Sequence, residues 1–215
     1  MIFILIAMLQ PDVQRKPRGR PRKFDRDEAL ETAMRLFWSR GYEATSISDL
    51  TAAMGITPPS LYGTFGDKKS LFLEAVERYQ EDAGRSFGSA LTSAPTAEEA
   101  VRRLLLDTID YFTDAKRPKG CMVVLSATNC TSGSADIFDA LAQKRRAVAK
   151  AIRTRIVFGR DAGELAGDID VDALAELVTA TYYGLSINAR DGVSRKRLRG
   201  SVEQLMRLWP RNTNS

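Results

Sequence analysis

The chain of 215 residues contains no histidine and only two cysteines. Histidine is the general base of Ser-His-Asp and Cys-His hydrolases and a ligand in most zinc sites, so its absence argues against both. The sequence also lacks a glycine-rich phosphate loop and any obvious pairing of nucleophile and base. Two cysteines, Cys121 and Cys130, are too few for a disulfide framework, which favours a reducing compartment. We therefore expect a cytoplasmic, non-enzymatic protein without a metal or other cofactor.

Long hydrophobic runs are scarce as well. The apolar stretch MIFILIAML, residues 1–9, has about half the length that a bilayer span needs. It also lacks the basic segment and the small-residue cleavage site of a secretory signal. We predict no membrane partner. Two interpretations stay open: an extension ahead of a true start at Met8, or a segment that packs against a neighbour.

Positive charge is concentrated in one short segment of a chain whose net charge is +5. Residues 10–23 carry six basic side chains and one acid, whereas residues 24–85 carry seven basic and eleven acidic side chains. We expect residues 1–23 to form a disordered arm, apolar and then basic. Its Gly-Arg-Pro segment resembles an AT-hook, whose arginines lie in a narrow minor groove. A loosely phosphate-bound tail is the alternative. The candidate DNA contacts of the arm are Arg18, Arg20 and Arg22.

From Phe24 onward, apolar residues recur at helical spacing, which predicts an all-α chain of about nine helices. The short apolar run 121–127 fits a strand or a helix by periodicity alone, and its helical surroundings favour a helix. We expect residues 24–85 to form one domain and residues 86–215 a second, helical domain. The expected helices span residues 26–40, 46–54, 58–64, 68–87, 96–112, 121–127, 134–158, 170–190 and 194–209.

Two adjacent prolines, Pro58 and Pro59, mark the start of the third helix. The first four N–H groups of a helix have no partner inside it, so proline loses nothing there. Thr57 is a suitable N-cap. Two short helices joined by a turn of only Gly55, Ile56 and Thr57 form a helix-turn-helix, whose second helix enters the DNA major groove.

The segment ALETAMRLFWSRGYEATSISDLTAAMGI at residues 29–56 is followed by Leu61, Tyr62, Phe65, Lys68 and Leu71 without gaps. In this pattern the region from Phe24 to Tyr79 resembles the DNA-binding domain of the TetR family of bacterial transcriptional regulators. The resemblance implies base contacts from the third helix and phosphate contacts from the second helix, Tyr62 and Lys68. The alternatives are a half-buried core aromatic for Tyr62 and a solvated lysine without a DNA contact for Lys68. The candidate DNA contacts outside the arm are Thr45, Ser46, Thr57, Pro58, Pro59, Ser60, Tyr62, Gly63, Thr64 and Lys68.

The chemistry of the third helix departs from ordinary base readout. None of its candidate residues is the arginine, asparagine or glutamine that reads a base edge bidentately. We expect readout through thymine methyls, hydroxyl groups and DNA shape. Leu61 and Phe65, together with Phe37 and Leu50, are expected in the core.

The resemblance also implies a homodimer in which the last two helices of each subunit form a four-helix bundle. Apolar stripes on these helices agree with that arrangement, because a helix that is apolar on more than one side needs a second partner. The alternative places both helices inside one subunit. The candidate interface residues are Leu177, Thr181, Gly184, Leu185, Leu198, Val202, Leu205, Met206 and Trp209.

The middle helices of the family usually enclose an effector pocket. The candidate lining residues are Leu105, Ile109, Phe112, Cys121, Met122, Leu125, Phe138, Leu141, Tyr182 and Tyr183. Some relatives with a similar Gly-Cys segment respond to oxidants or electrophiles. Lys119 and a helix N-terminus would lower the thiol pKa of Cys121, whereas a buried, inert cysteine is the alternative.

These expectations combine into a sequence-specific, nucleoid-associated regulator, a homodimeric repressor that an unknown small-molecule or reactive effector releases from operator DNA. The alternative is an architectural or activating DNA-binding protein without a dedicated inducer. An architectural role needs no second domain of this size, which favours the repressor.

Overall fold

The computed structural model describes residues 24–127 and 131–212, and these residues are helical apart from loops and one isolated β-bridge between Leu165 and Arg211. The all-α prediction is confirmed. The predicted arm, with Arg18, Arg20 and Arg22, and Cys130 lie outside the described residues. Within the described part, no helix combines the length and apolar character needed to cross a bilayer.

The first four helices begin where short polar side chains can cap them. They are α1 (Arg26–Arg40), α2 (Ile47–Met54), α3 (Pro58–Phe65) and α4 (Lys68–Ala83). Their N-caps are Asp25, Ser46, Thr57 and Asp67, each of which accepts a hydrogen bond from a backbone N–H in the first turn. Phe37, Leu50 and Leu61 are fully buried and Phe65 nearly so, as predicted.

The remaining elements are η1 (Gly84–Gly88), α5 (Ala90–Ser93), α6 (Ala97–Phe112), α7 (Met122–Leu125), η2 (Ser132–Ser134), α8 (Ala135–Asp161), α9 (Val171–Arg190) and α10 (Arg195–Arg207). Two predictions are wrong here. The α-helix expected to reach residue 87 changes into a π-helix after Ala83, and α5 lies in residues 88–95, where no helix was expected.

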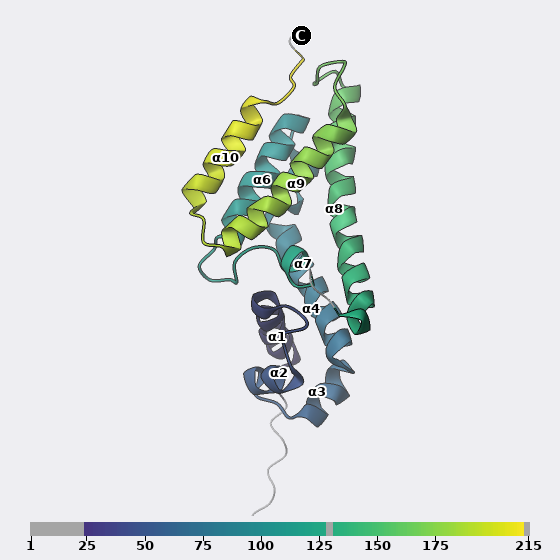
Figure 1. The fold of residues 1–215 in the computed structure, drawn as a ribbon, viewed down its shortest axis with the longest axis vertical. Helices are drawn as coiled ribbons and strands as arrows, with labels where there is room; N and C mark the ends of the chain where they lie inside the picture. Colours follow the sequence, from purple (N-terminus) through teal and green to yellow (C-terminus); the bar gives the residue numbers. More distant parts are fainter. Residues whose placement is uncertain (1–23, 128–130, 213–215) are drawn as a thin grey trace, which may run out of the picture.

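The helices form an elongated molecule (Figure 1). Helices α1, α2 and α3 lie at one end, α6, α9 and α10 pack together at the other, and the long α8 runs along one side. Helix α4 extends from α3 toward the upper bundle, and α7 lies between α1 and that bundle. Helix α4 therefore connects the helix-turn-helix directly to the second half of the chain.

The end of α1 is hydrogen-bonded to the segment around α7. The Arg35 guanidinium donates to the Lys116 carbonyl at 2.8 Å, and the Trp38 indole N–H donates to the Gly120 carbonyl at 3.1 Å. The Tyr42 N–H donates to the Ser126 carbonyl at 2.9 Å. The α7 segment is therefore a second connection between the two halves of the chain.

Candidate DNA-binding surface and effector cavity

Helices α2 and α3 are separated by a turn whose geometry the sequence defines. Gly55 ends α2 in the left-handed conformation at φ 65°, ψ 31°, and this conformation favours glycine. Thr57 then caps α3, accepting from the Ser60 N–H at 3.4 Å, and Pro58 and Pro59 occupy the first two helical positions. The predicted helix-turn-helix is confirmed.

Helix α3 presents one face to solvent and buries the other. Leu61 and Phe65 lie in the core. Its outward face consists of the exposed Thr57, Pro58, Pro59, Tyr62 and Gly63, with Ser60 and Thr64 partly exposed. Tyr62 keeps 49% of its surface. A β-carbon added at Gly63 would meet no atom within 4 Å, so the fold itself does not require glycine there.

The hydroxyl groups at the start of α3 are close to each other. Thr57 Oγ1 and Ser60 Oγ lie 2.9 Å apart, and one donates to the other. A hydroxyl keeps further hydrogen-bonding capacity after one such bond. Both side chains can therefore still meet a base or a phosphate.

Thr45 corrects one sequence prediction. Its side chain is fully buried, its hydroxyl donates to the Gly41 carbonyl at 2.7 Å and its N–H donates to the Tyr42 carbonyl. Neither group can face a phosphate. Its neighbour Ser46 is exposed but closes a capping box with Asp49, whose carboxylate accepts from the Ser46 N–H at 2.9 Å.

The N-terminus of α2 thus already holds an anion. Hydrogen bonds from the Ser46 hydroxyl and N–H keep the pKa of the Asp49 carboxyl below its ordinary value, so this group is charged at neutral pH. The Arg40 guanidinium donates to the same carboxylate at 3.1 Å. Sequence reasoning missed Arg40, an exposed cation beside the α2 N-terminus whose position in the fold follows only from the packing of α1 on α2.

Lys68 lies at the start of α4, half-buried, with its ammonium 4.3 Å from the centre of the Tyr42 ring. Burial lowers the Lys68 pKa, and the Glu43 carboxylate acts in the opposite direction. The aromatic face holds the cation beside α3. The sequence predicted Lys68 at the DNA-binding surface but not its contact with the Tyr42 ring.

A cavity of about 180 Å³, partly open to solvent, lies between α4, η1, α7, α8 and α9. It is lined by Tyr79, Gln80, Ala83, Gly84, Gly88, Cys121, Val123, Val124, Arg145, Val148, Tyr182 and Tyr183. Its walls are mostly apolar with a few polar groups, which is the usual character of a small-molecule site.

Most of the predicted pocket residues do not line this cavity. Cys121, Tyr182 and Tyr183 do. The others named from the sequence belong to the core or to the surface: Leu105, Ile109, Phe112, Met122 and Leu141 are fully buried, Leu125 packs against the core, and Phe138 is 42% exposed. The sequence could not distinguish them, because core and pocket use the same apolar residue types.

For Cys121 the sequence left a reactive thiol and a buried, inert one open, and its surroundings fit the second. Burial raises the pKa of its thiol, although the neighbouring Tyr79 hydroxyl and the N–H groups at the start of α7 act in the opposite direction. Lys119, expected to stabilise a thiolate, donates instead to the Thr113 carbonyl at 2.7 Å. The thiol is 3% exposed and neutral at physiological pH, which agrees with the buried, inert alternative.

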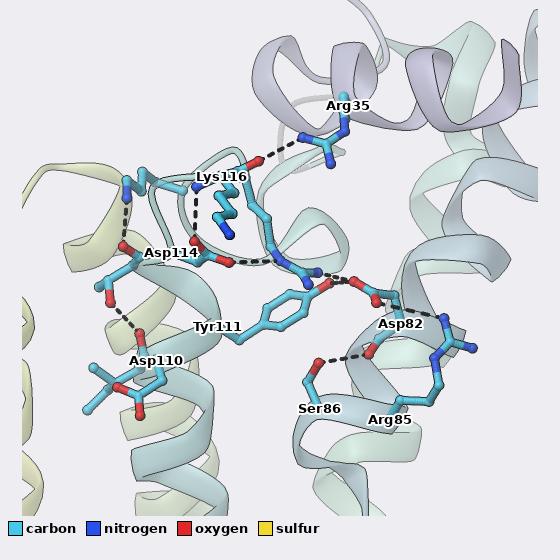
Figure 2. A network of polar contacts seen from close by, with 12 residues as sticks. Arg35, Asp82, Arg85, Ser86, Asp110, Tyr111, Asp114 and Lys116 are labelled. Atoms are coloured by element: carbon cyan, nitrogen blue, oxygen red, sulfur yellow. Dashed lines mark hydrogen bonds and ion pairs between the residues drawn. The ribbon is translucent and has the colours of Figure 1, made fainter. Parts of the chain in front are cut away.

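A polar network joins the end of α4 to α6 and the loop that follows it (Figure 2). The Tyr111 hydroxyl donates to the Asp82 carboxylate at 2.8 Å, and the Arg117 guanidinium donates to the same carboxylate. Arg117 also pairs with Asp114 at 3.2 Å. Burial raises the pKa of Asp82, but the hydrogen bonds from Tyr111 and Arg117 outweigh it and keep the pKa below its ordinary value.

Comparison with known proteins agrees with this geometry. Residues 29–75 match the family model described as bacterial regulatory proteins, tetR family, and residues 97–199 match a tetracyclin repressor-like C-terminal domain. The HTH-type transcriptional repressor ComR of Escherichia coli K12 is 34% identical over 91% of this chain and 94% of its own length. The chain belongs to the TetR family.

Further TetR-family relatives share both halves of the chain. YezE of Bacillus subtilis 168, an uncharacterized HTH-type transcriptional regulator, is 30% identical over 86% of this chain and 96% of its own length. A solved structure of a cysteine mutant of the TetR family transcriptional regulator CifR, complexed with 26bp double-strand operator DNA, is 45% identical. The match spans 89% of this chain and 100% of the CifR chain, with a TM-score of 0.84.

In this TetR-family chain, most of the residues predicted to form the dimer interface are buried within one subunit. Leu185, Leu198, Val202, Met206 and Trp209 are buried within the protomer, because α10 packs on α6 and α9 of the same chain. Leu177, Thr181, Gly184 and Leu205 remain at least partly exposed. The five buried residues are therefore not available for direct contact between subunits.

A different set of side chains faces outward on α9 and just after α10. Three large apolar side chains keep much of their surface: Leu177 keeps 50%, Ile187 48% and Leu208 80%. Leu177, Gly184 and Ile187 recur at helical spacing on one face of α9. Gly184 and Gly200 have no atom within 4 Å of an added β-carbon, so a second helix can approach them closely.

Proposed function

We propose that this TetR-family chain is a homodimeric transcriptional repressor that binds operator DNA through α3 and is released by a small molecule bound in the cavity. The observation that carries the proposal is the outward face of α3, where exposed small and hydroxyl-bearing residues surround Tyr62. The TetR-family relatives named repressors, and the relative solved on operator DNA, support it.

In this proposal, α3 enters the major groove with its N-terminal end first. Pro58, Pro59 and the methyl group of Thr57 contact thymine methyls, and the Ser60 hydroxyl contacts a base edge or phosphate. Tyr62 and Lys68 hold phosphates on either side. The basic arm, Arg18 to Arg22, adds charge that the described helix-turn-helix region lacks.

The dimer forms through the outward faces of α9 and α10, centred on Leu177, Gly184 and Ile187. Exposed apolar side chains at helical spacing, interrupted by glycine, support a four-helix contact between subunits. Such a dimer presents two copies of α3 to one duplex, so the operator should be a palindrome.

The cavity supports release by an effector because two of its walls reach the DNA-binding helices. Helix α4 lines the cavity with Tyr79 and Ala83 and starts at Lys68 beside α3. Helix α7 lines it with Val123 and Val124 and precedes Ser126, whose carbonyl accepts from the Tyr42 N–H. A ligand that shifts either wall changes the spacing of the two α3 helices.

The proposed repressor is cytoplasmic and nucleoid-associated and has no catalytic activity. Its DNA-binding domain ends near residue 85, and its effector-binding and dimerisation domain follows. An architectural or activating role is the second candidate function.

Selection of bound duplexes from a random DNA library, followed by footprinting, tests the proposal. We expect enrichment of one palindrome whose half-sites lie one or more helical turns apart, about 10 base pairs each. Recovery of unrelated sequences would contradict the repressor and favour the architectural role.

A further inference from the structure

The effector cavity contains a buried hydroxyl group without a strong partner. Tyr79 lines the cavity, is 2% exposed, and its hydroxyl has no oxygen or nitrogen hydrogen-bond partner among the described residues. The Cys121 thiol lies beside it, but sulfur is a weak acceptor. Buried polar groups are nearly always hydrogen-bonded, so an unsatisfied donor in a cavity wall marks a position at which a ligand can accept a hydrogen bond.

Two other polar groups of the cavity wall already have partners within the protein. The Tyr183 hydroxyl already donates to the Arg145 carbonyl at 3.0 Å. The Arg145 guanidinium donates to the Val123 carbonyl at 3.0 Å and lies 5.6 Å from the centre of the Phe138 ring. No carboxylate is among the lining residues, and the one cation, Arg145, already donates to Val123, another residue of the wall. The Tyr79 hydroxyl can therefore donate to an acceptor on a ligand, and an uncharged oxygen suffices for that bond.

The size of the cavity limits the ligand. An apolar cavity of about 150 Å³ in another protein holds benzene. At about 180 Å³, this one has room for a single ring with a short substituent. Its apolar lining, which includes Ala83, Val123, Val124 and Val148, suits a mostly hydrocarbon body.

We propose that the cavity binds a small, uncharged carbonyl compound about the size of one ring, whose oxygen accepts a hydrogen bond from the Tyr79 hydroxyl. This inference rests on the proposed function in one respect only, that the cavity is the effector site. It adds the chemical class of the effector and the residue that recognises it.

Three probes of similar size test the inference by calorimetry on the full chain. Acetophenone carries a carbonyl, isopropylbenzene replaces its oxygen by a methyl group, and benzoate carries a negative charge. We expect acetophenone to bind more tightly than either of the others. In Tyr79→Phe, the Kd for acetophenone should rise about fivefold, as the loss of one ordinary hydrogen bond predicts, while the Kd for isopropylbenzene stays within twofold.

The melting temperature without ligand separates recognition from a structural role. Tyr79→Phe removes a buried hydroxyl whose neighbour, the Cys121 thiol, is only a weak acceptor, so its melting temperature should be equal to or above that of the wild type. Tyr183→Phe is the matched control, since it lines the same cavity but loses a hydrogen bond within the protein. It should melt lower and keep the preference for acetophenone over isopropylbenzene.

The inference is overturned if acetophenone does not bind, if it binds Tyr79→Phe as tightly as wild type, if benzoate binds best, or if Tyr79→Phe lowers the melting temperature. The proposed function fails differently. If acetophenone binds with the expected dependence on Tyr79 but does not release operator DNA, the ligand class stands and the effector role of the cavity is wrong. If the chain does not bind any operator, the repressor itself is wrong.

Discussion

At the scale of single residues, Gly63 shows how DNA binding and protein stability make opposite demands. Glycine within a helix costs about 0.5–1 kcal/mol relative to alanine, and the fold leaves open space where a β-carbon would lie. We predict that Gly63→Ala raises the free energy of unfolding by up to that amount. It should also weaken operator binding about tenfold or more, because the added methyl group separates α3 from the DNA. Thermal melting and fluorescence anisotropy measure the two effects on one sample. An unchanged operator affinity would show that α3 does not approach DNA at this position.

The residues also show what sequence reasoning could and could not predict. N-caps such as Ser46 and Thr57 were predictable, because a cap depends on neighbours within one turn. Thr45 was not, because its burial depends on how the turn after α1 folds back on Gly41. Nor could the sequence reveal the unpaired Tyr79 hydroxyl, which depends on several elements meeting around one cavity.

At the scale of elements, the Asp82 network holds the end of α4 against α6 and the loop after it. The folded-state pKa of Asp82 lies below its ordinary value of about 3.9, so the network contributes stability above that pH and loses it as the pH falls through the folded-state pKa. We predict that Asp82→Asn costs roughly 1–2 kcal/mol at pH 7, since the carboxylate is only partly exposed and bonded to Arg117. Melting curves from pH 7 to pH 3 should show the difference from wild type shrinking below about pH 4. A difference that stays constant with pH would rule out the charged network as its source.

The α9 and α10 faces give the second prediction at this scale. Leu177 is half exposed in the protomer, so Leu177→Asp should fold normally but place a charge in the proposed dimer interface. Sedimentation at micromolar concentration should show a dimer for wild type and a monomer for this variant. Phe158→Asp is the control, because Phe158 is 63% exposed but lies on α8. A dimer that survives Leu177→Asp would place the interface elsewhere.

These two helices explain why an apolar stripe is ambiguous. The pattern of Leu198, Val202 and Met206 correctly predicted a helix with one buried face, but the partner of that face is α6 and α9 of the same chain. Periodicity reports that a face is buried and does not report what covers it. The boundaries of α1, α2 and α9 were predictable from caps and glycines, whereas the π-helical turn η1 carried no sequence signal that we could read.

At the scale of the whole molecule, positive charge and the helix-turn-helix are in different parts of the chain. Residues 24–85 carry more acids than bases, and the basic arm lies before them. We predict that deletion of residues 1–23 weakens operator binding and reduces the slope of log K against log salt concentration by roughly 0.9 for each phosphate that the arm neutralises. Titrations between about 50 and 200 mM salt measure that slope. An unchanged slope would exclude the arm from DNA contact.

Specific recognition of an operator by α3 is tested by a comparison of two duplexes. The affinity of the full chain is measured by fluorescence anisotropy, at about 150 mM salt, for the DNA upstream of its own gene and for a shuffled duplex of the same composition. We predict a preference of roughly 10³-fold or more for the upstream DNA, as specific DNA-binding proteins show. Equal affinity for the two duplexes would contradict the account.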